Sequence, residues 1–178
     1  MLNNLWIVIC EGTSLKPHIE EVKRIAKKYT DTTIGVNLAP IVFPCKYWCF
    51  MDNCMWECAY AHHKPEKIYI AASVEPTYIP FREKNPKIIH LRNQNGCSGN
   101  AAIAYAIQQG AKNIITAGHD LTQGWEHYNG RPGKQQSDAY IQLCRRCLRD
   151  MVTHNDANIY SLDKENVLNL PVYDISKL

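Results

Sequence analysis

The sequence lacks an apolar run long enough to cross a membrane or to form the core of a signal peptide. Its first apolar run, LWIVIC at residues 5–10, is followed at once by Glu11 and Gly12. No other segment approaches the ~18 consecutive apolar residues that a membrane helix requires. We therefore expect a cytoplasmic protein in which the eight cysteines are reduced thiols rather than disulfides.

The sequence also lacks a strong excess of charge of either sign. Its 20 basic side chains are balanced by 17 acidic ones, for a formal net charge of +3. Proteins that bind nucleic acids or membrane surfaces carry a concentrated basic stripe, so neither partner is expected. Only Arg145, Arg146 and Arg149 are clustered, and we interpret them as a solvated helix face, with binding of a polyanionic acceptor as the alternative.

Low-complexity segments are absent as well, and the apolar residues, 46% of the chain, are evenly distributed. Short β-like runs alternate with segments of helical periodicity, which favours a parallel sheet with helices on both faces. We expect one Rossmann-like α/β domain over residues 1–178, a three-layer α/β/α fold with a mostly parallel sheet. The predicted strands are residues 5–10, 33–37, 47–51, 67–72, 87–91, 113–117 and 158–161. The predicted helices are one with Pro17 in its first turn that ends at Tyr29, then residues 53–62, 98–109 and 136–154.

Small and polar residues follow the predicted strands. In an open parallel sheet, ligands bind beyond the carboxyl ends of the strands, so these residues are candidates for a site. The turns at 12–14 and 98–100 each precede a helix, whose free N–H groups and positive dipole end attract an anion such as phosphate. The alternative for each turn is a simple helix cap, by Thr13 or Ser14 in the first. This sheet-edge set consists of Gly12, Thr13, Ser14, Asn37, Asp52, Ser98, Gly99, Gly118, His119 and Asp120.

The order of these motifs resembles that of a protein family. The run IVICEGTSL is similar to the opening of the bacterial sialyltransferases and of the related MptE-like (DUF115) proteins, whose first strand ends in G-x-G-P-S-L. Asn37, at the end of TIGVN, matches their second-strand Asn. The run from Cys97-Ser98-Gly99 through AAIAYAIQQGAKNIITAGHD matches their Ser-Gly helix, the next strand and the G-x-D after it. The resemblance spans most of residues 5–161.

The resemblance implies a core that holds a nucleotide, in the sialyltransferases a CMP-sugar, with the sheet-edge set as its contacts. Two residues depart from the family pattern, since Glu11 replaces an Asn or Gly and Thr13 replaces a Pro. A carboxylate repels a phosphate unless a metal ion bridges them. Mg²⁺ or Mn²⁺ held by Asp52 or Asp120 is therefore an alternative to direct phosphate contact.

A polar, glycine-rich loop at residues 119–135 is expected to lie over the site, because loops of this length are uncommon without a function. In the sialyltransferase-like enzymes, a His after the G-x-D motif is the general base towards the acceptor hydroxyl, and His127 lies in that segment here. Imidazole suits the task because its unperturbed pKa of ~6.5 leaves it largely neutral at pH 7. Tyr128 would stabilise the leaving phosphate, and Asp120 completes the catalytic set. His119 is a second candidate base, and a surface His without a role is the alternative for both.

Four cysteines lie close together in the sequence and form a candidate Zn²⁺ site. Their spacings are not those of paired C-x2-C motifs, so buried free thiols that pack as small apolar side chains are the alternative. The four are Cys45, Cys49, Cys54 and Cys58.

Three functions follow from these observations. The first is a nucleotide-sugar-dependent glycosyltransferase, and the second is a diphosphokinase of the 6-hydroxymethylpterin type that uses ATP and Mg²⁺. The third is a nucleotide-binding module without catalysis. All three predict a small-molecule nucleotide as ligand, and a homo-oligomer in which a neighbouring subunit supplies the acceptor site is a further alternative.

Overall fold

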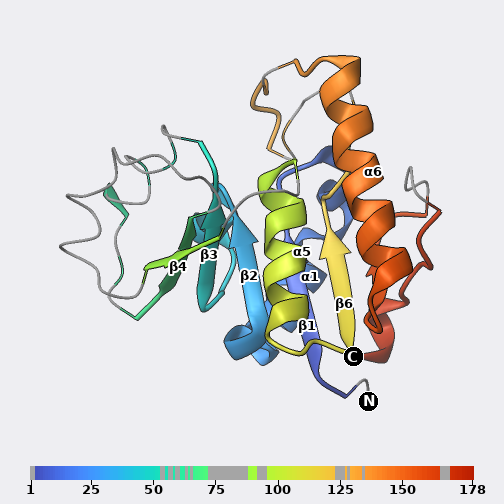
Figure 1. Cartoon of the computed structure of the whole chain (residues 1–178). Coiled ribbons are helices and arrows are strands. Elements are labelled where there is room, and N and C mark those ends of the chain that lie inside the picture. The colour runs from blue at the N-terminus through green and yellow to red at the C-terminus, as the bar shows by residue number, and fades with distance from the viewer. Residues whose placement is uncertain are drawn as a thin grey trace.

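The centre of the molecule is a seven-stranded sheet in which every pair of neighbouring strands is parallel (Figure 1). The strand order is β5-β4-β3-β2-β1-β6-β7. The strands are β1 (Leu5–Ile9), β2 (Thr33–Val36), β3 (Tyr47–Phe50), β4 (Ile68–Ala71), β5 (Ile88–His90), β6 (Asn113–Ala117) and β7 (Asn158–Ser161). The computed structural model describes residues 3–52, 55, 58, 61–62, 64, 66–71, 88–91, 96–122, 127, 129–133, 135–164 and 169–178.

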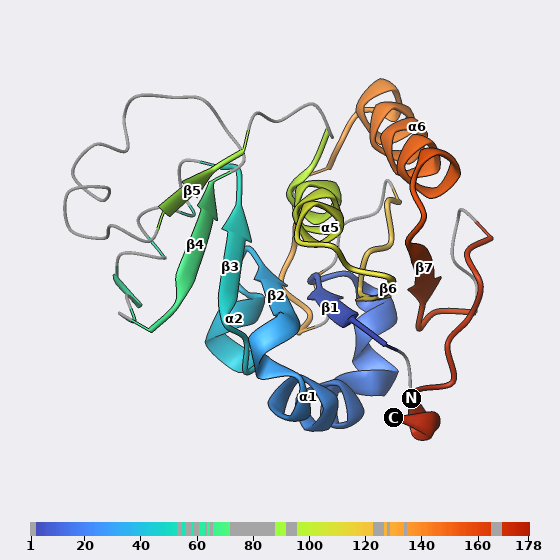
Figure 2. The ribbon, with the colours of Figure 1, turned by 60° about the horizontal axis from the view of Figure 1, so that its bottom comes forward.

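Helices cover both faces of the sheet (Figure 2), which confirms the predicted three-layer α/β/α fold. One layer contains α5 (Ser98–Gln108) and α6 (Asp138–His154), and the other contains α1 (Ile19–Lys28) and α2 (Ala39–Val42). Short 3-10 helices are η1 (Thr13–His18), η2 (Thr30–Thr32) and η4 (Ile175–Lys177).

The sequence of β1 is apolar throughout because its side chains pack in cores on both faces of the sheet. Trp6 and Val8 pack in the core under α5 and α6, whereas Ile7 and Ile9 pack in the core that includes α1. All residues of the strand are buried because helices cover both faces of the sheet. Trp6 also contacts Tyr105 of α5 edge-on, with ring centroids 6.2 Å apart, which fixes this helix over the middle of the sheet.

The first helix differs from its prediction. The segment after β1 begins as the 3-10 helix η1 with Pro17 inside it, and regular α-helix starts only at Ile19. Neither Thr13 nor Ser14 caps η1, because both hydroxyls donate to Asp120. The simple helix cap considered for this turn is therefore wrong.

Two further segments bear on the predictions. The helix α2 is not predicted, because four residues are too few to show helical periodicity. In the predicted helix at 53–62, Met55, Cys58 and Ala61 are helical, and most of the other residues lie outside the described part of the chain. No helix among the described residues is both long and apolar enough to cross a bilayer.

The strand order reverses at β1, which has β2 on one side and β6 on the other. Ligands bind to open α/β sheets at such a switch point. Here the helix after β1 covers one face of the sheet, and the helix after β6 covers the other face. Two backbone hydrogen bonds join the segments just beyond these strands, from Cys10 N to Ala117 O (2.8 Å) and from Gly12 N to Gly118 O (2.9 Å). The fold therefore points to this edge as the place for a site.

Candidate functional site

A cleft opens at this edge, between the ends of β1, β2, β3 and β6 and the start of α5. The cleft has a volume of about 120 Å³ and opens to solvent. Residues far apart in the sequence meet here because parallel strands end at the same edge. Eight residues of the predicted sheet-edge set line the cleft, namely Gly12, Asn37, Asp52, Ser98, Gly99, Gly118, His119 and Asp120.

The other predicted site residues lie beside the cleft or outside the described residues. Thr13 and Ser14 are not in its walls, and their hydroxyls donate to Asp120. His127 is 6% exposed and forms an isolated antiparallel bridge with Gly12, so it lies against the first turn rather than in the cleft wall. Tyr128 is outside the described residues.

The carboxylate of Asp120 occupies the hydrogen-bond donors of the first turn. It accepts from the backbone N–H of Ser14 (3.1 Å), from the Ser14 hydroxyl and from the Thr13 hydroxyl (3.3 Å). A Cβ atom at Gly12 would overlap this carboxylate, so the close approach requires glycine. An internal carboxylate thus lies where the sequence predicts a bound phosphate.

Asp120→Ala should lower the free energy of unfolding by about 2–3 kcal/mol, because the donors of the first turn lose a charged acceptor. Urea unfolding measures the loss. Since the vacated donors would form an anion site, inorganic phosphate should restore part of the stability in this variant and have little effect on the parent protein. The control is Asp31→Ala, an exposed partner of Lys46 at 3.2 Å, which should cost less than about 1 kcal/mol. Equal losses in the two variants would contradict the prediction.

Glu11 is a buried carboxylate in the wall of the cleft, with 4% of its side chain exposed. Its Oε2 accepts a hydrogen bond from Leu38 N (3.2 Å), and its Oε1 lies 3.8 Å from both His127 Nδ1 and Arg131 Nη2. Burial raises the pKa of Glu11, while the Leu38 N–H and the Arg131 guanidinium oppose the rise. These contacts tie the segment 127–131 to the end of β1.

Arg131 also determines which nitrogen of His127 carries the proton. Its Nη2 lies 3.3 Å from His127 Nε2, and a guanidinium can only donate, so Nε2 accepts. The proton of the neutral ring is then on Nδ1, which faces Glu11. Burial and the nearby Arg131 charge both lower the pKa of His127, so the ring is neutral near pH 7. In this geometry Arg131 covers the basic nitrogen of the predicted general base.

His119 and Cys10 form a second pair, inside the cleft. Asn100 Nδ2 donates to Cys144 O (2.8 Å), which leaves Asn100 Oδ1 to accept from His119 Nε2 at 2.8 Å. The lone pair of His119 is therefore on Nδ1, and Cys10 Sγ lies 3.7 Å from that atom. Burial lowers the pKa of His119 to about 4, opposed in part by Asp120, and burial raises the pKa of Cys10 well above its usual range. Both side chains are therefore neutral at pH 7.

Two residues with left-handed backbone line the cleft, Asn37 (φ 53°) and Leu121 (φ 50°). Such strain is typical of functional sites and persists only where neighbours hold it. Trp48 Nε1 donates to Asn37 O (2.5 Å), and Arg145 donates to Leu121 O from Nε (3.1 Å) and Nη2 (2.9 Å). The buried Oδ1 of Asn37 has no hydrogen-bond partner among the residues that the structure describes. Asn37 Oδ1 is therefore a hydrogen-bond acceptor for a ligand. Arg145, interpreted from the sequence as part of a solvated helix face, also holds the backbone of Leu121 in the wall of the cleft.

Sequence reasoning misses Tyr140, which lines the cleft from the start of α6. Its hydroxyl donates to Gly96 O at 2.8 Å, so it connects α6 to the turn before α5. No local motif marks this residue. The sequence signal that could have pointed to Tyr140 is Ser137, a residue type that caps helices, three positions before it. Ser137 does cap α6, since the backbone N–H of Tyr140 donates to Ser137 Oγ (3.3 Å).

The four predicted zinc ligands do not share one environment in the described structure. Cys45 Sγ lies 3.2 Å from Lys67 Nζ, whereas Cys49 Sγ donates to Ser98 O (3.5 Å) under the start of α5. Cys58 is partly exposed, and Cys54 lies outside the described residues. Within the described ranges, no group of three or more Cys, His, Asp or Glu side chains is arranged to hold a metal ion. The zinc site stays a prediction.

No family model matches the sequence, and no curated protein sequence matches it. The sialyltransferase CstII from Campylobacter jejuni, solved with the substrate analogue cytidine-5'-monophosphate, superposes with a TM-score of 0.59 at 13% identity, over 97% of this chain and 85% of that chain. The sialyltransferase CST-II in complex with a trisaccharide acceptor and CMP gives 0.58 at 16% identity, over 94% and 85% of the two chains. The chain shares the sialyltransferase fold. At this identity the likeness establishes the fold alone, and the resemblance to the MptE-like proteins stays a prediction from the sequence.

Proposed function

We propose that this protein is a glycosyltransferase-like transferase whose cleft binds a nucleotide-linked sugar of the CMP-sugar class. The observation that carries the proposal is the convergence of four strand ends and the start of α5 on one cleft, at the switch point of the sheet. Similar folds have been solved with CMP, with CMP-3FNeuAc and with a trisaccharide acceptor, which supports the same ligand class here.

The start of α5 is the proposed phosphate position. Its first intrahelical hydrogen bond runs from Ala101 N to Cys97 O (3.0 Å), so the N–H groups of Ser98 and Gly99 precede the helical bonds. No side chain caps this helix end, and both residues line the cleft. Backbone N–H groups and the positive end of the helix dipole would receive the phosphate there. The first turn is less suitable, because Asp120 already occupies its donors.

The charge of the cleft favours a ligand with one phosphate. Three carboxylates line it, from Glu11, Asp52 and Asp120, and its described walls contain no Lys or Arg side chain. Each additional phosphate would add repulsion in a partly buried space. The same carboxylates support the second candidate, a diphosphokinase, because Asp52 and Asp120 would hold Mg²⁺ between the phosphates of ATP. Metal dependence therefore separates the two functions.

In the proposed transfer, His127 takes the proton of the acceptor hydroxyl, and the sugar moves from the phosphate to that oxygen. Arg131 covers His127 Nε2 at 3.3 Å, so this role requires the Arg131 side chain to move when the acceptor binds. The same contact supports the third candidate, a nucleotide-binding module without catalysis. His127→Ala should abolish turnover in a transferase, and a variant with unchanged turnover would remove His127 as the base.

The deciding experiment is a thermal and chemical denaturation series with CMP, CMP-sugars, UMP and ATP, each with and without Mg²⁺. A ligand at 100 times its Kd should add about 2.7 kcal/mol to the free energy of unfolding. Stabilisation by CMP or a CMP-sugar in the presence of EDTA supports the proposed transferase. Stabilisation only by ATP with Mg²⁺ supports the diphosphokinase, and no stabilisation by any of these nucleotides excludes both.

Asn37→Ala should weaken CMP binding at least tenfold, because the ligand loses the buried Oδ1 acceptor in the cleft. Isothermal titration calorimetry measures the affinity. Asn169→Ala is the matched control, since Asn169 has the same left-handed backbone (φ 51°) and does not line the cleft. Both variants lose a residue suited to positive φ, so a stability loss common to both is a backbone effect. An affinity that falls equally in both would contradict the assignment.

A further inference from the structure

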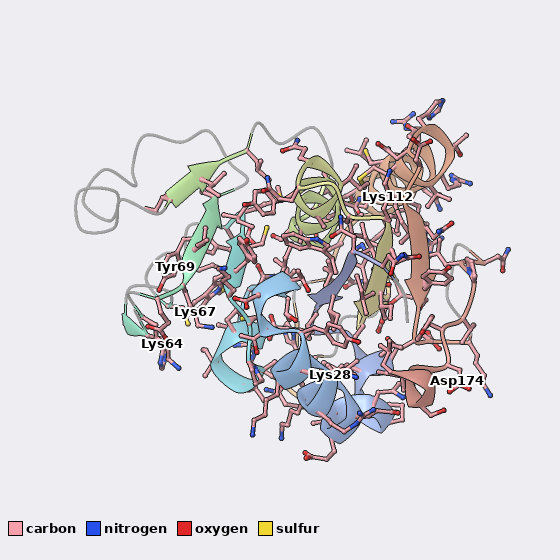
Figure 3. The ribbon with its side chains drawn as sticks, turned by 90° about the horizontal axis from the view of Figure 1, so that it is seen from below. Lys28, Lys64, Lys67, Tyr69, Lys112 and Asp174 are labelled. Atoms are coloured by element: carbon pink, nitrogen blue, oxygen red, sulfur yellow. The ribbon has the colours of Figure 1, made fainter. Side chains whose placement is uncertain are left out.

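A buried lysine and a buried cysteine are in direct contact at the opposite edge of the sheet from the cleft. Lys67 immediately precedes β4, and Cys45 precedes β3 by two positions. Lys67 Nζ donates to Cys45 O (2.7 Å) and lies 3.2 Å from Cys45 Sγ. The two residues are 4% and 5% exposed. Figure 3 shows Lys67 from this side, beside Lys64 and Tyr69.

A buried ammonium group is usually paired with a carboxylate, because an isolated charge is costly to remove from water. In the part of the chain that the structure describes, no carboxylate oxygen lies within 4.0 Å of Lys67 Nζ. Among the described residues, the hydrogen-bond partners of this amine are two atoms of Cys45, the backbone oxygen and the sulfur. In the described structure, Cys45 therefore takes the place that a carboxylate usually has beside a buried lysine.

The backbone holds the amine and the thiol together from both sides. Ile68 N donates to Lys46 O (2.9 Å), and Lys67 N donates to Lys64 O (3.1 Å). Tyr69 fixes the same turn, since its hydroxyl accepts from Lys64 N at 2.9 Å and its ring stacks on Trp48 with centroids 5.8 Å apart. Because the segments on either side of the pair are anchored, the amine and the thiol stay within reach of each other.

The surroundings of the sulfur bear on its reactivity. Cys45 Sγ is close to two donors, the Lys67 amine and the backbone N–H of Gly35. Burial raises the pKa of Cys45, and these two donors oppose the rise by stabilising the thiolate. Reaction with an oxidant is then faster at mildly alkaline pH, because the thiolate is the reactive form.

We propose that Cys45 and Lys67 form a covalent N–O–S bridge when the protein is exposed to hydrogen peroxide. The S–H bond and one N–H bond of the neutral amine break, and one S–O and one N–O bond form. Sulfur and nitrogen are each oxidised by two electrons. Two molecules of hydrogen peroxide accept these four electrons, supply the bridging oxygen and leave as three molecules of water. The bridge connects the starts of β3 and β4 and is cleaved again by an excess of thiol.

Mass spectrometry of the intact chain after treatment with hydrogen peroxide at pH 8.5 tests the proposal. The bridge adds one oxygen and removes two hydrogens, a gain of about 14 Da that dithiothreitol reverses, whereas a sulfenic acid adds about 16 Da. After trypsin digestion, the peptide that ends at Lys46 should be joined to a peptide in which the bond after Lys67 is uncut. These measurements use the parent protein, so they do not depend on the folding of a variant.

Lys67→Arg keeps the positive charge and the donors but should lose the gain in mass, because the guanidinium is not a nucleophilic amine. Cys147→Ser is the matched control and should keep the gain, since Cys147 lies on α6, far from Lys67 in the sequence. An oxidised protein that carries only sulfenic or sulfinic acid at Cys45 overturns the proposal. A disulfide from Cys45 to another cysteine, or no change at either residue, overturns it as well. None of these outcomes depends on nucleotide binding, so the proposed function is tested separately.

Discussion

Gly99→Ala should abolish CMP binding at the proposed site and lower the free energy of unfolding by about 1–3 kcal/mol. A Cβ atom at Gly99 would lie 2.5 Å from His119 Cε1, 2.6 Å from His119 Nδ1 and 3.0 Å from Cys10 Sγ. The imidazole cannot swing away without breaking its hydrogen bond to Asn100 (2.8 Å), so the start of α5 or the end of β1 must shift. That shift moves the N–H groups at which the phosphate would bind.

Calorimetric titration with CMP and urea unfolding measure the two effects of Gly99→Ala. The matched control is Gly110→Asn, at the other end of α5, where the nearest atom to a new Cβ is Asn4 Nδ2 at 3.9 Å. Gly110 has a φ of 81°, and asparagine tolerates this conformation better than other residues, so the control should lose less than about 1 kcal/mol and bind CMP normally. A Gly99→Ala protein with the stability and CMP affinity of the parent would refute the close packing at the start of α5.

Lowering the pH from 7 to 4 should destabilise the protein through His119 by on the order of 3 kcal/mol. The pKa of His119 is lowered to about 4 in the fold, whereas an unfolded histidine titrates near ~6.5. Between these values the unfolded chain binds more protons, so stability is lost as the pH falls through this window. Above pH 6.5 the contribution is fully present, because the imidazole is neutral in both states.

Two other groups of the site also change the free energy of unfolding in acid, and their effects have opposite signs. His127 has a lowered pKa and adds to the acid loss, whereas the raised pKa of Glu11 makes the fold more stable as the pH falls through it. Comparison of the parent with His119→Gln isolates His119, because the other groups are common to both. The variant should lose about 3 kcal/mol less than the parent between pH 7 and 4 in urea unfolding. His62→Gln, at an exposed position, should follow the parent curve, and a His119→Gln curve parallel to the parent would contradict the buried neutral imidazole.

Much of the fold is predictable because local patterns determine it. The unbroken apolar run of β1 requires a sheet covered on both faces, and the alternation of strands with amphipathic segments requires parallel strands joined by helices. Parallel strands end at one edge, so residues such as Asn37, Ser98 and His119 could be expected in one place before any contact was known. The predicted strands and the helices α1, α5 and α6 agree with the structure to within a few residues.

The interactions of those residues could not be predicted, because they join segments distant in the sequence. Ser14 and Asp120 are 106 residues apart, and no local pattern indicates that the carboxylate accepts hydrogen bonds from the turn at which the sequence predicts a phosphate. No local pattern indicates the hydrogen bond from Arg145 to Leu121 O in the cleft wall either. Nor does one indicate that Arg131 covers Nε2 of His127.

The sequence by itself thus determines a parallel α/β sheet, its helical layers and the edge at which a ligand site forms. Only the tertiary structure decides which donors at that edge are already occupied. Asp120 occupies the first turn, while the start of α5 is without a side-chain cap. The tertiary structure also decides that Cys45 contacts Lys67 rather than Cys49, although Cys49 is much nearer in the sequence. The physical reason is that hydrophobic periodicity sets the orientation of each element, whereas hydrogen-bond partners depend on how the elements pack against one another.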